Sequence, residues 1–395
     1  MTENHTSDEL DAWLRLVSEP GLGRASVRSL LAAIGLPQDI LASSVRTLAR
    51  HLPQDLAQRL ASPPSSDVQA GIDAGHELLA KPNHHLITLA DPQYPASLFE
   101  IPDPPVVLFV SGDPTLLHRP SVAIVGARSA TDGGKDNARA FARYLAERGW
   151  GIVSGLARGI DAAAHEGAMQ AGPQGGRTIA VMAGGLDDIY PRQHQALAEQ
   201  IAAMGALVSE YPPGTPAVPF RFPDRNRLVA ALARGVLVVE AAAQSGSLLT
   251  ARLGIECGRE VFAIPGSIHA PLSRGCHALI RQGAKLVEQG RDIEEELTRF
   301  GPVPGAGVPH AVPAQPGRQA AGVPRSANRM MKDPTTGRVL AAMGFDPADV
   351  DLLCERSGLA FPRVAAVLTE LELNDIVQRL DDGRYVRRQH GIIYG

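Results

Sequence analysis

Residues 121–165 read SVAIVGARSATDGGKDNARAFARYLAERGWGIVSGLARGIDAAAH, and this stretch decides the fold. Apolar runs at 122–125 and 152–153 are each followed by a loop of small residues with one arginine, and each loop leads into a helix-like segment. Repetition of strand, loop and helix predicts a parallel sheet with crossover helices. Such sheets bind ligands at the carboxyl ends of their strands, and the opening of a helix favours an anion. We therefore expect a site for a phosphate-bearing ligand at these loops.

The same alternation continues along the middle of the chain. Seven strand candidates occur in all, at residues 122–125, 152–153, 178–182, 206–209, 236–239, 261–264 and 285–287. Strands that alternate with helical segments in this way predict a doubly wound α/β sheet. A proline-rich segment at 91–105 leads into a further strand candidate at 106–110, and we expect it to be extended and to pack against the flank of the sheet.

Bulk properties describe a multidomain soluble protein. A chain of 395 residues is too long for one ordinary core, and its 44% hydrophobic and 20% charged residues are typical of globular proteins. We find no signal peptide and no apolar run long enough for a membrane span, which predicts a cytoplasmic protein. Three scattered cysteines, at positions 257, 276 and 354, argue against disulfides and a cysteine-based zinc site. No metal or cofactor is expected.

Positive charge gathers in the middle of the chain although the whole chain is acidic. The net charge is −4, but residues 121–290 contain 17 Lys and Arg against 14 Asp and Glu, a balance of +3. Nearly all of this positive charge is arginine, since the chain has four lysines. Arginine suits bidentate phosphate contacts and stacking on bases, but arginine-rich codon usage of a GC-rich genome explains the same bias equally well.

The regions before and after the central α/β domain have the sequence patterns of smaller domains. Residues 1–80 predict a small helical domain, and the glycine turn at 20–23 resembles a helix-hairpin-helix or SAM-like unit. Its surroundings are acidic, so packing or partner contact is favoured over DNA binding, which stays open. Residues 81–300 form the central α/β domain, and the Pro-, Gly- and Ala-rich residues 301–332 predict a flexible linker.

The last part of the chain, residues 333–395, has three helical segments and a hairpin, the pattern of a winged helix. Winged helices commonly bind DNA. This one carries ten acidic residues against seven arginines, which favours contact with a protein.

The spacing of the motif residues excludes several classes of enzyme. The loop after residue 125 lacks the glycine pattern of a dinucleotide site, and the chain has neither a P-loop nor a Gly-x-Ser-x-Gly elbow. Asp161 and His165 lie four residues apart and could pair as orienter and base, although such pairs are more often structural. The adjacent His84 and His85 would point to opposite faces of a strand, which is wrong for a shared metal.

What remains is a set of arginines and small polar residues at strand ends, with aromatic residues nearby. The set is Arg128, Ser154, Arg158, Arg225, Arg227, Ser245 and Ser247, with Phe220 and Phe222 just before the Arg225–Arg227 segment. Arginines along a backbone and a ring that stacks a base are the ingredients of single-strand binding. In the alternative interpretation, Phe222 fills the core and Arg227 pairs with Glu240. With 4% aromatic residues, we expect one or two stacked bases.

These motifs together resemble the DNA-processing protein family DprA, also called Smf. The resemblance rests on residues 122–133, on SGLARGID at 154–161, on FPDRNR at 222–227, and on Glu240 with Ser245, Gly246, Ser247, Thr250 and Ala251. It extends from about residue 10 to residue 287, and the winged-helix tail resembles the terminal domain of many members.

The resemblance implies an extended Rossmann-like domain that binds single-stranded DNA without sequence preference and has no catalytic residue. It also implies a homodimer that loads a RecA-type recombinase onto incoming strands during natural transformation, with a possible contact to a single-strand-binding protein. The implied DNA-binding residues are Gly126, Arg128, Ser154, Gly155, Arg158, Phe222, Arg225, Asn226, Arg227, Ser245, Gly246 and Ser247. Dimer and recombinase surfaces are assigned loosely to residues 268–287.

Two other interpretations stay open. In one, the protein is an enzyme that acts on a nucleotide or nucleoside phosphate in the same pocket, with Glu240 or Glu210 as the acid. In the other, it is mainly an interaction hub whose acidic end domains do the work.

Overall fold

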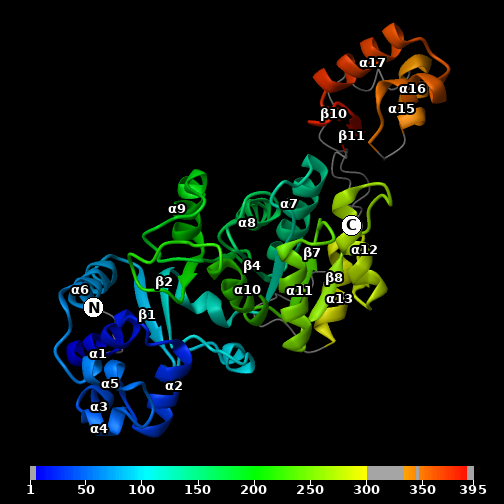
Figure 1. Cartoon of the computed structure of the whole chain (residues 1–395). Coiled ribbons are helices and arrows are strands. Elements are labelled where there is room, and N and C mark those ends of the chain that lie inside the picture. The colour runs from blue at the N-terminus through cyan, green and yellow to red at the C-terminus, as the bar shows by residue number, and fades with distance from the viewer. Residues whose placement is uncertain (1–5, 300–332, 344–346, 389–395) are drawn as a thin grey trace.

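A computed structural model describes residues 6–299, 333–343 and 347–388 (Figure 1). Its centre is a nine-stranded sheet with the order β1-β2-β6-β5-β4-β3-β7-β8-β9. The strands are β1 (His84–Thr88), β2 (Val107–Gly112), β3 (Ser121–Val125), β4 (Gly151–Ser154), β5 (Thr178–Val181), β6 (Ala206–Ser209), β7 (Gly235–Val238), β8 (Glu260–Ala263) and β9 (Lys285–Leu286). Strands β3 to β9 pair in parallel, whereas β1 and β2 pair antiparallel at one edge.

This sheet confirms the doubly wound α/β prediction. The chain runs from β3 outward to β6 on one side and then returns to add β7, β8 and β9 on the other. The seven predicted strands correspond to β3–β9, and the candidate at 106–110 is β2. Strand β1 was not predicted, because it begins with the half-buried His84 and His85 and its sequence gives no clear alternation.

Helices cover both faces of the sheet. Helices α7 (Asp132–Glu147), α8 (Ile160–Gln170) and α13 (Gly290–Thr298) pack on the face that presents Ile124 and Ile152. Helices α10 (Arg221–Ala231), α11 (Gly246–Glu256) and α12 (Arg274–Arg281) pack on the face that presents Val125 and Val153. Side chains alternate between the two faces along a strand, so Ile124 and Val125 belong to different cores, as do Ile152 and Val153.

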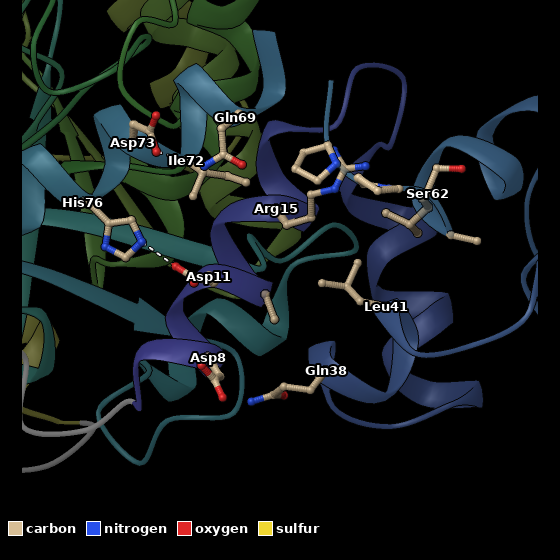
Figure 2. Close-up of a pocket in the computed structure, with 15 residues that line it drawn as sticks. Asp8, Asp11, Arg15, Gln38, Leu41, Ser62, Gln69, Ile72, Asp73 and His76 are labelled. Carbon is tan, nitrogen blue, oxygen red and sulfur yellow. Dashed lines mark hydrogen bonds and ion pairs between the residues drawn. The ribbon is translucent and has the colours of Figure 1, made fainter. Parts of the chain in front are cut away.

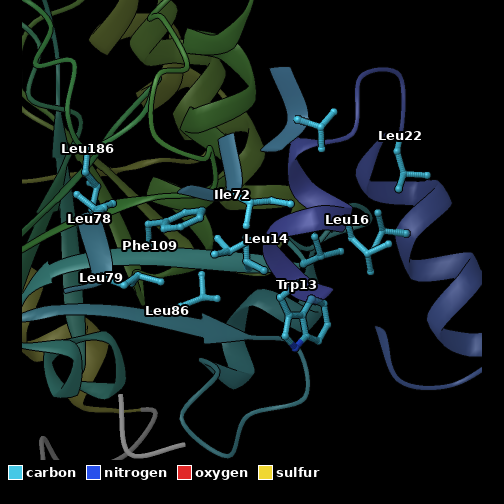
Figure 3. Packing of buried hydrophobic residues seen from close by; sticks show 14 of the residues in the cluster. Trp13, Leu14, Leu16, Leu22, Ile72, Leu78, Leu79, Leu86, Phe109 and Leu186 are labelled. Carbon is cyan, nitrogen blue, oxygen red and sulfur yellow. The ribbon is translucent and has the colours of Figure 1, made fainter. Parts of the chain in front are cut away.

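The N-terminal helices share a core with one end of the sheet. They are α1 (Ser7–Ser18), α2 (Arg24–Ala33), α3 (Pro37–Leu41), α4 (Val45–Leu48), α5 (Gln54–Leu60) and α6 (Ser66–Leu79). Trp13, Leu14 and Leu16 of α1 belong to the same buried cluster as Leu86 of β1 and Phe109 of β2 (Figure 3). Helix α9 (Gln195–Met204) contributes to this cluster as well. The helical N-terminal part is thus packed directly on the antiparallel edge.

The proline-rich lead-in is less extended than predicted. It contains the 3₁₀ helix η1 (Ala96–Glu100), and the Tyr94 hydroxyl donates to the carbonyl of Pro105 at 2.7 Å, which folds the segment back on itself. Three further 3₁₀ helices are η2 (Pro114–His118), η3 (Arg192–His194) and η4 (Pro271–Ser273).

The C-terminal domain is a winged helix, as predicted. It consists of α15 (Pro334–Met343), α16 (Val350–Ser357), α17 (Phe361–Leu373) and an antiparallel hairpin of β10 (Val377–Arg379) and β11 (Tyr385–Arg387). These elements enclose their own hydrophobic cluster. The linker predicted at 301–332 lies outside the described residues. Within the described ranges, no helix is long and apolar enough to cross a membrane.

Candidate functional site

A cavity of about 380 Å³ opens at the carboxyl ends of β3, β4 and β7. Ligands bind doubly wound sheets where the strand order reverses, which here is beside β3. The cavity brings together nine of the twelve residues expected from the sequence: Gly126, Arg128, Gly155, Phe222, Arg225, Asn226, Ser245, Gly246 and Ser247. Segments up to 125 residues apart in the chain therefore meet at one site, since Val125 and Thr250 both line it.

The floor of the cavity depends on Gly126. A Cβ atom at this position would lie 2.6 Å from Cγ1 of Ile160 and 2.9 Å from the carbonyl oxygen of Glu240. Close to it, the Ala127 amide donates to the same Glu240 carbonyl at 2.7 Å. A glycine here lets the end of β3 approach both α8 and the end of β7, which a side chain would prevent.

Arg225 is buried and organises the loop after β4. Its Nη1 donates to the carbonyl oxygens of Gly155 and of Val181, the latter at 2.5 Å. The guanidinium lies over Gly155, where a Cβ atom would come within 2.5 Å of it. Only 4% of Arg225 is exposed, and burial lowers its pKa to about 10. Arg225 therefore shapes the cavity from below and brings a positive charge to it.

Asp161 holds the same loop from the other side. Its carboxylate accepts from the amides of Gly155 at 3.1 Å and Ala157 at 3.4 Å. Burial raises the pKa of this carboxyl, and the charge of Arg225 opposes that effect. The amides of Gly155 and Ala157, which the sequence predicted to be available for an anion, are thus bonded to Asp161.

A platform of rings and a guanidinium forms the rim of the cavity. The guanidinium carbon of the exposed Arg128 lies 5.2 Å from the centre of the Phe222 ring. The Tyr190 ring centre lies 5.4 Å from that of Phe222. Tyr190 is 49% exposed, and it could not be identified from the sequence because it precedes η3 and belongs to none of the motifs. The half-buried Phe222 does not fill the core, contrary to the alternative interpretation.

The start of α11 supplies the polar wall. Ser245 caps the helix by accepting from the Ser247 amide at 3.3 Å, and the two hydroxyls lie 2.6 Å apart. Gly246 is exposed between them, with no atom within 4 Å of a Cβ placed there. The positive end of an 11-residue helix and two hydroxyls thus face the cavity beside Arg128.

The start of α7 does not offer the anion site that the sequence predicted. The carboxylate of Glu240 accepts there from the Thr131 amide at 3.0 Å and the Thr131 hydroxyl at 2.6 Å. Burial raises the pKa of Glu240, whereas these two hydrogen bonds lower it. The carboxylate of Glu240 thus occupies the N-terminal end of α7, where a phosphate would otherwise bind.

Three expected site residues lie elsewhere. Ser154 is fully buried and donates to the Ile124 carbonyl at 2.6 Å. Arg158 is exposed on the neighbouring loop, outside the cavity lining. Arg227 faces away from the cavity and pairs with Glu210. The pairing of Arg227 with Glu240 in the alternative interpretation is therefore wrong, because Arg227 pairs with Glu210 and Glu240 with Thr131.

The sequence pair Asp161 and His165 is not an acid-base pair. His165 is fully buried, and its Nδ1 lies 2.7 Å from the Thr178 hydroxyl. That hydroxyl donates to the Ile152 carbonyl at 2.8 Å, so the imidazole must donate to it. His165 is therefore a structural residue that connects α8 to β5. In the described ranges, no group of three His, Cys, Asp or Glu side chains is placed to hold a metal ion.

A second cavity, of about 800 Å³, lies among the N-terminal helices (Figure 2). Asp8, Asp11 and Asp73 line it, and Asp11 is 2.5 Å from the imidazole of His76. The Arg15 guanidinium in the lining is paired with Glu19 at 2.6 Å. These carboxylates disfavour a phosphate backbone, in agreement with the expectation of packing or partner contact for this part of the chain.

The fold and the cavity define a class of protein: an α/β protein with an extended Rossmann-like sheet, a helical part before it and a winged helix after it. The family model described as DNA recombination-mediator protein A matches residues 85–298, and the DprA winged helix domain matches residues 320–383. The chain therefore belongs to the DprA family, and the resemblance seen in the sequence is confirmed.

Individual relatives agree with this assignment. Protein Smf of Escherichia coli is 39% identical over 96% of each chain. The DNA processing protein DprA of Streptococcus pneumoniae is 48% identical over 53% of this chain and 73% of its own. A crystal structure of DprA from Streptococcus pneumoniae superimposes with a TM-score of 0.64 at 36% identity, covering 75% of this chain and 99% of that one.

Proposed function

We propose that the protein binds single-stranded DNA, without sequence preference, in the cavity beside β3. The observation that carries this proposal is the rim, where the Arg128 guanidinium and the Tyr190 ring flank the Phe222 ring. A ring beside a cation suits one stacked base and its phosphate, and every base has a face that can stack. The serines at the start of α11 supply further phosphate ligands.

The proposed DNA site comprises the residues that line this cavity. It includes Gly126, Arg128, Gly155, Phe222, Arg225, Asn226, Ser245, Gly246 and Ser247, with Tyr190 added at the rim. Ser154 and Arg227 are left out because neither lines the cavity: Ser154 is fully buried and Arg227 pairs with Glu210. Arg158 is exposed near the cavity and is kept as a comparison.

The protein acts in this proposal as a non-enzymatic mediator. It loads a RecA-type recombinase onto incoming strands during natural transformation, as a homodimer and with a possible contact to a single-strand-binding protein. Membership in a family of recombination mediators supports this role. The region 268–287 suits a protein interface, since Ile268 is 75% and Leu286 44% exposed.

One experiment tests the DNA site. Fluorescence anisotropy with labelled single and double strands should show tighter binding of single strands, with Phe222→Ala weakening it roughly 5- to 100-fold, the contribution of one stacked base. Phe361→Ala, which removes a phenylalanine of the winged helix that is more exposed than Phe222, is the control. Equal loss in both variants, or no loss in Phe222→Ala, would contradict the assignment.

The rival function is an enzyme that acts on a nucleotide in the same cavity. Glu240 and Glu210 were the candidate acids, and both are bonded to protein groups, Glu240 to Thr131 and Glu210 to Arg24 and Arg227. Incubation with a panel of nucleotides should therefore show no turnover. Turnover that Glu240→Gln abolishes would establish the rival.

A further inference from the structure

A third cavity, of about 580 Å³, lies on the other side of the start of α10. Four parts of the chain line it: the turn after α1 and the start of α2, the segment before β2, the residues after β6, and the start of α10. They contribute Leu22 and Arg24, Asp103 and Val106, Tyr211, and Phe220 and Arg221. None of these residues lines the cavity beside β3. The two cavities therefore flank the first turn of the same helix.

The rim of this cavity also combines rings with a guanidinium. The Arg221 guanidinium carbon is 5.0 Å from the centre of the Tyr211 ring and 5.4 Å from that of Phe220. Phe220 is 67% exposed, which is unusual for so large an apolar side chain. The floor contains apolar residues, among them Leu22 and Val27. A flat aromatic ligand fits such a surface better than a phosphate does.

The carboxylates near this cavity are paired. Arg24 bonds to Asp103 at 2.7 Å and to Glu210 at 3.0 Å, and Arg28 bonds to Asp103 at 2.6 Å. Among the described residues, Arg221 has no carboxylate partner, and its Nη1 donates to the Pro216 carbonyl at 2.5 Å. Asp224, the third carboxylate in the lining, is 46% exposed and lies 3.7 Å from Arg24. Arg221 thus keeps its charge at the rim, while the lining carboxylates are paired with Arg24 and Arg28.

The spacing on α10 connects this cavity to the DNA site. Phe220 and Phe222 are two residues apart, and on a helix such residues point to opposite sides. A strand that stacks one base on Phe222 and crosses the start of α10 would bring a neighbouring base to Phe220. We propose that the third cavity holds a second base of the same DNA strand, stacked on Phe220 beside Arg221; this inference rests on the proposed function.

The test measures how affinity depends on strand length. Oligothymidylates of increasing length are titrated against the full chain, against Phe220→Ala and against Phe222→Ala. The wild type should gain affinity when the strand becomes long enough to reach both rings. Phe220→Ala should lose that gain, roughly 5- to 100-fold for long strands, and bind the shortest strands like the wild type.

Replacements at position 220 separate stacking from general apolar contact. Phe220→Trp should retain the gain and Phe220→Leu should lose it, because leucine has similar apolar character without a ring. Circular dichroism of each variant confirms folding, and an exposed side chain leaves the fold intact in all of them.

The outcomes distinguish the two proposals. If Phe222→Ala weakens binding while Phe220→Ala binds long strands like the wild type, the second base site is overturned and the proposed function stands. If Phe220→Leu binds like the wild type, stacking at Phe220 is overturned. If neither Phe222→Ala nor Phe220→Ala changes affinity at any length, the proposed function itself fails.

Discussion

At the residue scale, the arginines that the sequence grouped together have different roles. Arg128 is exposed at the rim, Arg225 is buried under the loop after β4, and Arg227 pairs with Glu210. The motif FPDRNR can be recognised in the sequence. The different roles of Arg225 and Arg227 cannot, because the direction of each side chain depends on where α10 begins. Of these three arginines, Arg128 is the one that lines the cavity and is also exposed to solvent.

Arg128→Ala should weaken binding of single-stranded DNA of any sequence. Loss of one phosphate contact should also reduce the slope of log affinity against log salt by about 0.7. Titrations at several salt concentrations measure both effects. Arg158→Ala is the matched control, since it removes an exposed arginine from the neighbouring loop outside the cavity. An equal change in slope for Arg158→Ala would mean that the strand does not follow the cavity.

Arg225→Leu should destabilise the fold itself. The substitution removes the donor for the Gly155 and Val181 carbonyls, and of the two positive charges that act on the buried Asp161 it removes Arg225, the stronger, and leaves Arg128. We expect a loss of roughly 1–3 kcal/mol in the free energy of unfolding, the cost of unpaired buried polar groups. Urea denaturation measures it, with Arg128→Ala as the control that should unfold like the wild type. Wild-type stability in Arg225→Leu would show that the loop does not depend on this residue.

At the element scale, the sequence predicted most of the sheet and missed where one helix starts. Helix α10 begins at Arg221, so the motif FPDRNR at 222–227 lies within the helix, which the sequence pattern did not predict. Pro223 is compatible with this start, because in the first turn of a helix the missing N–H of proline costs nothing. This placement directs Phe222 and Arg225 into one cavity and Phe220 into another. Tyr190 could not be predicted, since a ring in an irregular segment has no periodicity to locate it.

Acid should weaken the connection between α8 and β5. Burial lowers the pKa of His165 to about 3, from an ordinary value near 6.5 in the unfolded chain. Between these values the unfolded chain binds the additional proton, so stability is full above pH 6.5 and falls as the pH decreases toward 3. The expected slope from this group is about 1.4 kcal/mol per pH unit.

Denaturation at a series of pH values, with His165→Gln beside the wild type, measures that slope. Glutamine can donate to the Thr178 hydroxyl but does not titrate, so the variant should lose this part of the pH dependence. Identical pH dependence in the two proteins would mean that His165 is not the group responsible.

At the scale of the whole molecule, the two end regions are attached in different ways. The N-terminal helices share one hydrophobic cluster with β1 and β2 (Figure 3), to which α9 also belongs, and Arg24 of α2 bonds to Glu210 after β6. The winged helix encloses a cluster of its own, and Arg388 forms a partly exposed ion pair with Asp132 of α7 at 3.3 Å. The sequence predicted a small helical domain and a winged helix at the two ends. It could not show that one shares its core with the sheet and the other does not, because this depends on which apolar faces meet.

Two truncations should therefore have opposite results. A chain that ends at residue 299 loses the winged helix and an ion pair of the kind that contributes about 0–1 kcal/mol, so we expect its unfolding midpoint and its affinity for single strands to match the full chain. A chain that begins at residue 81 exposes apolar residues of β1 and β2, such as Leu86 and Phe109, and we expect it to aggregate or unfold. Size-exclusion chromatography, urea denaturation and anisotropy measure these outcomes. Loss of DNA affinity in a well-folded chain ending at 299 would instead assign DNA contact to the winged helix, and a stable chain beginning at 81 would contradict the shared core.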